Sequence, residues 1–124
     1  MTGTCYCCTG TDDSFGANSD QGWCAGKLIK VRCENMNGAM RLQGARLEDC
    51  YLSTTGADKA GVLVKDSNCV LYNCTILRTG TDYSVKATGS YNIKIAHCRF
   101  NGAIDPQLTN LIGVPCNVLD GDVS

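Results

Sequence analysis

The sequence predicts an all-β fold: a single-stranded, right-handed parallel β-helix of about five coils over residues 27–121. Three observations predict it. A block that ends in Cys recurs five times, a Gly follows each block within a few residues, and helix signals are poor. No stretch of about 12 residues keeps a helical period without Gly or a cluster of β-branched residues.

The repeated block reads Asn, five residues, Cys in its clearest copies, which span 68–74, 92–98 and 110–116. Two weaker copies span 27–33 and 44–50, and successive cysteines lie 17, 24, 24 and 18 residues apart. The two longer intervals contain additional alternating stretches at 62–64 and 85–87. A constant block joined by an arm of variable length is typical of a solenoid.

Stacked coils place equivalent residues above one another at about 4.8 Å, the ordinary spacing of strands. Inward columns should be apolar and similar in size, because a mismatch leaves a void or a clash. An Asn column suits a bend, because Asn tolerates left-handed backbone and stacked amides can hydrogen-bond along the column. The predicted ladder residues are Cys33, Cys50, Cys74, Cys98 and Cys116; Leu47, Leu71 and Ile95; Leu52, Ile76 and Phe100; and Asn68, Asn92 and Asn110.

The handedness follows from a general rule and has one competitor. Parallel β crossovers are almost always right-handed. The spacings of 17 and 18 residues are short for that form, however, and match the turn length of a left-handed β-helix. The sequence therefore favours the right-handed form and keeps the left-handed one as an alternative.

The two ends do not fit the repeat. Residues 1–26 are expected to be an irregular N-terminal arm or cap, since 9–22 is polar and rich in Gly, Ser and Asp, and 122–124 is a short tail. The arm holds Cys5, Cys7, Cys8 and Cys24, which could ligate zinc or could be buried or disulfide-bonded. Cys5 and Cys8 have the C-x2-C spacing, but the second such pair of a usual zinc site is absent, so no metal or cofactor is predicted.

Charge and cysteine content limit which classes of protein the sequence can belong to. The 124 residues carry 11 basic and 12 acidic side chains, which gives no reason to expect nucleic acid or an anionic membrane as partner. The chain shows no secretory signal and no apolar run that could cross a membrane. Ten Cys without a signal sequence indicate reduced thiols in the core, with disulfides between neighbouring ladder cysteines as the alternative.

The coils of Asn, five residues, Cys and a following hydrophobic residue resemble the right-handed parallel β-helix superfamily. Its familiar members are pectate-lyase-like enzymes and bacteriophage tailspikes, and the resemblance covers residues 27–121. The motif is one of packing, so it implies the fold and says little about function.

Family enzymes act on polysaccharides with several carboxylates on one outward face. The outward column nearest to such a site reads Arg32, Asp49, Asn73, His97 and Pro115. Asp49 and His97 would lie two rungs apart, about 9–10 Å, which is wide for an acid–base pair. Asp66, Asp82 and Asp105 read as turn residues. No catalytic residue is predicted.

Three hypotheses for function remain. The first is a structural virion protein, either a capsid decoration (cement) protein or a short tail-spike component. It would be assembled in the host cytoplasm as a homotrimer and would dock on a viral shell or tail protein through the N-terminal arm. The second is a polysaccharide lyase or hydrolase, or a fragment of one. The third is a module that binds glycans or proteins, for which the candidate aromatic residues are Trp23, Tyr51, Tyr72, Tyr83 and Tyr91.

Overall fold

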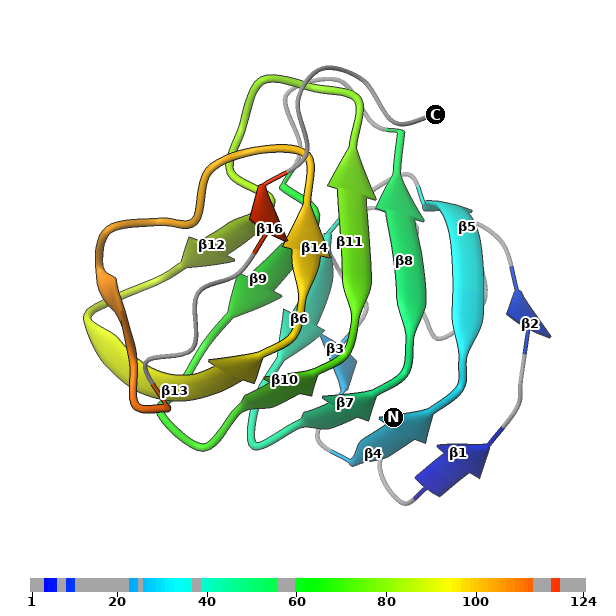
Figure 1. Cartoon of the computed structure of the whole chain (residues 1–124), viewed down its shortest axis with the longest axis horizontal. Helices are drawn as coiled ribbons and strands as arrows, with labels where there is room; N and C mark the ends of the chain where they lie inside the picture. Colours follow the sequence, from blue (N-terminus) through cyan, green and yellow to red (C-terminus); the bar gives the residue numbers. More distant parts are fainter. Residues whose placement is uncertain are drawn as a thin grey trace.

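The computed structural model describes residues 4–6, 9–10, 23–24, 26–36, 39–55, 60–112 and 117–118. This part of the chain forms strands, turns and bends but no helix, and its strands pair in parallel. They build three sheets, which we name A, B and C (Figure 1). The predicted all-β class is therefore confirmed.

From β1 to β14 each sheet takes every third strand of the chain, and β15 and β16 then join sheets A and B. Sheet A contains β1 (Thr4–Tyr6), β4 (Lys27–Ile29), β7 (Arg46–Glu48), β10 (Val70–Tyr72), β13 (Tyr91–Ala96) and β15 (Leu108–Asn110). Sheet B contains β2 (Thr9–Gly10), β5 (Arg32–Met36), β8 (Tyr51–Thr54), β11 (Thr75–Arg78), β14 (Arg99–Phe100) and β16 (Asn117–Val118). Sheet C contains β3 (Trp23–Cys24), β6 (Met40–Leu42), β9 (Val62–Val64) and β12 (Val85–Ala87).

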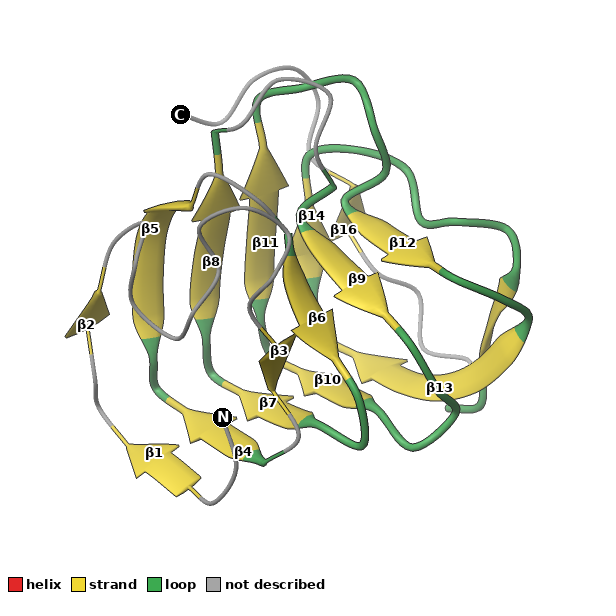
Figure 2. Ribbon diagram, turned by 180° about the vertical axis from the view of Figure 1, so that it is seen from behind, coloured by secondary structure: helices red, strands yellow, loops and turns green. Residues whose placement is uncertain are grey.

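The chain visits the sheets in the order A, B, C and then returns to sheet A one rung further along. Strands β4–β5–β6, β7–β8–β9 and β10–β11–β12 are three complete repeats of this path. Figures 1 and 2 show the same order from opposite sides, with the strands of each sheet lying side by side. The alternating stretches at 62–64 and 85–87 are strands β9 and β12.

The hydrophobic core lies between the three sheets, because alternate residues of each strand point inward. In sheet A the buried column is Leu28, Leu47, Leu71 and Ile95; in sheet B it is Cys33, Leu52, Ile76 and Phe100. Sheet C contributes Met40, Val62 and Val85, and also Leu42, Val64 and Ala87. Each large apolar side chain buried here contributes about 1.5–3 kcal/mol to folding.

The N-terminal segment was expected to be irregular, but its described residues extend the sheets. Strand β1 pairs with β4, β2 with β5 and β3 with β6, so each sheet gains one rung. The physical reason is that the outer edges of β4, β5 and β6 would otherwise present unpaired N–H and C=O groups.

Sheet C ends differently from sheet A at the other end of the molecule. After β12, the described residues add one isolated bridge to this sheet, between Ile104 and Val85. The buried carboxylate of Asp105 then accepts the N–H of Ala87 (3.1 Å) and the N–H of Gln107 (3.0 Å). Asp105 therefore satisfies a donor that the next strand would have bonded.

Asn110 does the same for sheet A. Its side-chain amide donates to the carbonyl of Ile95 (2.8 Å) and accepts the N–H of Ile95 (3.1 Å). The amide group imitates the peptide group of a neighbouring strand. Asp105 and Asn110 are the two functional side chains whose roles the sequence reasoning missed, although "DPQ" at 105–107 is a recognisable turn signal.

Candidate functional site

The corner between sheets A and B is the most regular part of the surface and the basis of the candidate site. Four exposed residues stand there with left-handed backbone: Lys30 (φ 53°), Asp49 (φ 54°), Asn73 (φ 52°) and His97 (φ 55°). Each follows a strand of sheet A and precedes a buried residue that leads into sheet B. Such a conformation costs an ordinary L-residue about 1–2 kcal/mol, and Asn and Asp adopt it most readily.

The sequence predicts the left-handed bend at Asn68, Asn92 and Asn110, but the structure has it elsewhere. The only non-Gly positive φ angles among the described residues belong to the corner column above. Asn110 lies opposite Ile93, whereas Asn92 lies opposite Thr109. Asn68 and Asn92 are exposed, and the N–H of Asn92 donates to Ser67 Oγ (3.3 Å). The three asparagines therefore do not form one aligned column.

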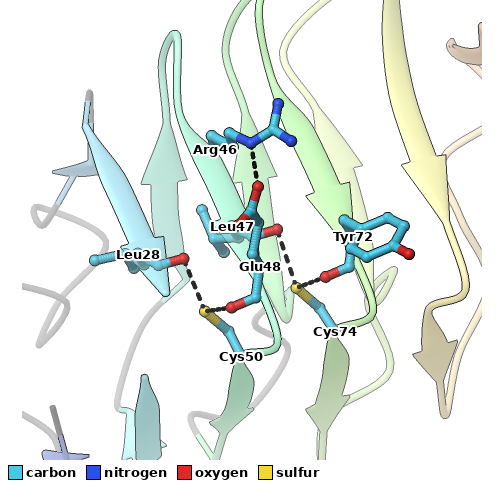
Figure 3. Close-up of polar contacts among 7 residues, drawn as sticks. All are labelled: Leu28, Arg46, Leu47, Glu48, Cys50, Tyr72 and Cys74. Atoms are coloured by element: carbon cyan, nitrogen blue, oxygen red, sulfur yellow. Dashed lines mark hydrogen bonds and ion pairs between the residues drawn. The ribbon is translucent and has the colours of Figure 1, made fainter. Parts of the chain in front are cut away.

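Below the corner lies a column of buried thiols. Each Sγ can donate its proton to either of two backbone carbonyls, one in its own repeat and one in the preceding repeat (Figure 3). Cys50 faces Glu48 O (3.2 Å) and Leu28 O (3.3 Å); Cys74 faces Tyr72 O (3.3 Å) and Leu47 O (3.4 Å); Cys98 faces Ala96 O (3.3 Å) and Leu71 O (3.4 Å). A thiol suits this position because it packs as a small apolar group and is still a weak donor.

Cys33 was predicted to belong to this thiol column, but it belongs to the next one. It lies opposite Leu52 in sheet B. Val31 holds the place that corresponds to Cys50, since the N–H of Tyr51 donates to Val31 O just as the N–H of Thr75 donates to Cys50 O. The block at 27–33 had been aligned by its cysteine, whereas the left-handed residue before the buried position sets the true register. Cys116 lies outside the described residues.

Five cysteines whose side chains the structure describes are buried thiols rather than disulfides: Cys33, Cys50, Cys69, Cys74 and Cys98. Hydrogen bonding with Cys50 and Cys98, together with burial, raises the pKa of Cys74 above its usual value. Burial raises the pKa of Cys69 to about 11. These two thiols are therefore neutral near pH 7, as packing groups should be.

The two residues considered for acid–base chemistry do not meet. Asp49 and His97 stand in the same corner column, and Asn73 stands between them. Asp49 Oδ1 accepts a hydrogen bond from Asn73 Nδ2 (2.7 Å). The ring of His97 makes an edge contact with Tyr72, with the ring centroids 5.7 Å apart.

The carboxylates that the structure describes are all held by near neighbours. Two carboxylates form ion pairs, each with an arginine of its own strand. Two others accept backbone N–H groups, in a turn or at the end of a sheet. The remaining two bind a side-chain amide at the corner and a lysine ammonium. The pairs are Glu34 with Arg32, Glu48 with Arg46, Asp66 with Gly44 and Asn68, Asp105 with Ala87 and Gln107, Asp49 with Asn73, and Asp82 with Lys86. These carboxylates serve turns and ion pairs.

The candidate aromatic residues fall in different places. Tyr51 lies under the guanidinium of Arg32, which is 4.0 Å from its ring centroid, and Tyr72 is 45% exposed. Tyr83 and Tyr91 are half-buried. Of Trp23 the structure describes only its place in β3. Tyr51 and Tyr72 therefore flank the corner from adjacent repeats.

The outward face of sheet A beside this corner is cationic and partly apolar. Its first outward column reads Lys27, Arg46, Val70 and Lys94, with Leu111 next to Lys94. Tyr72, Leu111 and Ile112 are the large hydrophobic side chains exposed in the described part of the chain. Val70, Lys94 and Leu111 line an open hollow of about 200 Å³ with Ser67, Asn68 and Cys69.

The described ranges contain no group of three or more His, Cys, Asp or Glu side chains that could hold a metal ion. The side chains of Cys5, Cys7, Cys8 and Cys24 lie outside what the structure describes. Within the described residues there is also no helix long and apolar enough to span a membrane. Comparison with known proteins found no matching family model, curated protein or solved structure.

Proposed function

We propose that this chain is a structural protein of a virus particle, either a capsid decoration (cement) protein or a short tail-spike component. It acts by associating with copies of itself, as a homotrimer, and by docking on a viral shell or tail protein through the segment 1–26. Its body is a right-handed parallel β-helix, because the path A, B, C repeats with one rung per turn and parallel crossovers are almost always right-handed.

The observation that carries this proposal is the stacking of equivalent residues over successive rungs. The column Leu28, Leu47, Leu71 and Ile95 is in direct register and fully buried, and the corner column beside it is equally regular. A body built in this way is stiff along the stacking direction, because every rung is bonded to both neighbours. Together with carboxylates that are engaged in ion pairs and turns, this favours a mechanical role.

The first test is the molar mass in solution, measured by light scattering behind size exclusion with and without a reducing agent. We expect a stable trimer whose mass does not depend on the reductant, because the described thiols are buried and free. A monodisperse monomer would contradict the proposal. The polysaccharide lyase or hydrolase would then be tested by cleavage of acidic polysaccharides with and without calcium, and the binding module by glycan binding.

A further inference from the structure

On the outer face of sheet A, exposed apolar side chains lie beside a lysine. We call this surface the sheet A patch. It consists of Val70, Tyr72, Lys94, His97 and Leu111. Tyr72 and Leu111 are 45% and 58% exposed. Val70 and Lys94 are in register, and the N–H of Leu111 donates to Ile93 O (2.8 Å), which places Leu111 on the next rung beside Lys94.

The Lys94 ammonium of this patch is not paired with a neighbouring acid in the described part of the chain. The ion pairs seen there use Arg32, Arg46 and Lys86 and do not include the Lys94 ammonium. His97 touches the ring of Tyr72 rather than a carboxylate. The surface therefore presents exposed apolar side chains beside one unpaired ammonium, next to the open hollow of about 200 Å³ at Lys94. Such a surface fits an extended segment in which apolar and acidic residues alternate.

The sequence contains a segment of that kind. Residues 119–124 read "LDGDVS", with Asp120 and Asp122 between Leu119 and Val123 and with no Lys or Arg. They follow β16, which pairs with β14 on the last rung of sheet B. A fully extended stretch of six residues spans about 20 Å, enough to leave one molecule and lie on another.

We propose that the sheet A patch binds the acidic segment 119–124 of a second copy of this chain. Asp120 and Asp122 lie against the Lys94 ammonium and the exposed His97 side chain, while Leu119 and Val123 cover Tyr72 and Leu111. Each copy then gives its segment to the next, which is a heterologous contact that closes at three copies. This inference rests on the proposed self-association and names the surface that produces it.

The test is a charge exchange in the full chain, read by sedimentation velocity over a range of concentrations. We expect Lys94→Glu, and separately the double change Asp120→Lys with Asp122→Lys, to weaken self-association at least about tenfold. Combining all three changes in one chain restores association, because complementary charges again face each other at every contact of the ring, whereas mixing the two variants does not, since a ring of three keeps at least one contact between copies of the same variant. The matched control is Lys27→Glu, the same substitution in the same outward column three rungs away, which leaves association unchanged.

Each other outcome overturns a defined part. A monomeric wild-type chain overturns this inference and the self-association of the proposed function together. A trimer that both charge variants leave intact overturns the assignment of the patch and leaves the proposed function standing. Loss of association in Lys94→Glu without rescue in the chain that carries all three changes shows that another acidic surface occupies the patch, and overturns segment 119–124 as its partner. Leu111→Ser, an exposed change, repeats the test if Lys94→Glu fails to fold.

Discussion

Two connections lead the chain from one sheet to the next, and they differ in how strictly they are kept. The corner from sheet A to sheet B uses two residues in each repeat from 27 onward, at 30–31, 49–50, 73–74 and 97–98. The connection from sheet B to sheet C spans 37–39, 55–61, 79–84 and 101–103. The first has one length and the second has several.

The difference has a physical cause. At the corner the chain is bonded on both sides: the N–H of Asn73 donates to Ala96 O in one direction, and the thiol of Cys74 faces Leu47 O in the other. An inserted residue would break these bonds and turn every following side chain to the opposite face. The described residues of the longer connections are bonded near the ends of the strands, as where Asn101 binds the N–H and carbonyl of Arg78.

The largest effect is expected from a charge placed under the corner. Cys74→Asp should unfold the protein, at a cost of more than about 4 kcal/mol, because an ionised carboxylate would be buried beside carbonyl oxygens that repel it. Circular dichroism and urea titration measure the outcome. His97→Asp is the control, since it adds the same group at an exposed corner position, where the corner residue of the preceding repeat is the amide Asn73 rather than a carboxylate. A cooperatively folded Cys74→Asp protein would show that the thiol column is not interior.

The next largest effect tests whether the variable connections are loose. A Cβ at Gly61 would lie 2.4 Å from the carbonyl oxygen of Ser84 and 2.6 Å from Ile76 Cγ2. We expect Gly61→Ala to lower the free energy of unfolding by about 1–3 kcal/mol, because backbone or core must shift. Gly89→Ala is the comparison, since its Cβ would meet only the Tyr91 side chain, no closer than 3.2 Å. Equal stability of the two variants would mean that the connection before β9 can shift to accommodate the added methyl group without loss of stability.

The same contrast explains how far sequence reasoning reached. Columns such as Leu47, Leu71 and Ile95 could be predicted because the repeat keeps a constant interval between the sheet A strand and the corner. Cys33 was assigned to the wrong column because the repeats were aligned by their cysteines. The feature that recurs in each repeat is a residue with left-handed backbone followed by a buried residue. Lys30 and Val31 satisfy that geometry without resembling the Asn–Cys pair at 73–74.

The caps could not be predicted for a different reason. Asp105 and Asn110 act only where the following strand is missing or short, so their role depends on which N–H and C=O groups remain unpaired. Spacing within one repeat does not contain that information. The sheet A patch could not be predicted either. It depends on Leu111 lying beside Lys94 on the neighbouring rung, and the two rungs differ in length.

A moderate effect is expected at the end of sheet C and should depend on pH. Burial alone would raise the pKa of Asp105, but the N–H groups of Gln107 and Ala87 lower it below its ordinary value of 3.8. A carboxyl whose pKa is depressed on folding stabilises the fold at neutral pH, and that contribution is lost as pH falls through and below 3.8. We expect Asp105→Asn to cost about 1–2 kcal/mol at pH 7 and less at pH 3.

Urea titrations at the two pH values measure this difference. Asp82→Asn is the control, because Asp82 forms a half-exposed ion pair with Lys86 and such pairs contribute about 0–1 kcal/mol. A loss of stability in Asp105→Asn that is the same at pH 7 and pH 3 would mean that packing rather than the charged cap accounts for it.

The smallest effect should differ in sign between two lysines of one repeat. Lys30 stands at φ 53° in the corner, where Gly removes the strain of a left-handed L-residue but makes the unfolded chain more flexible. We expect Lys30→Gly to raise the free energy of unfolding by about 0.5 kcal/mol. Lys27 lies in the extended strand β4, so Lys27→Gly should lower it by about 0.5–1 kcal/mol. If both changes lower stability equally, the contacts of the Lys30 side chain outweigh its backbone strain, and the corner is held by side chains rather than by its left-handed turn.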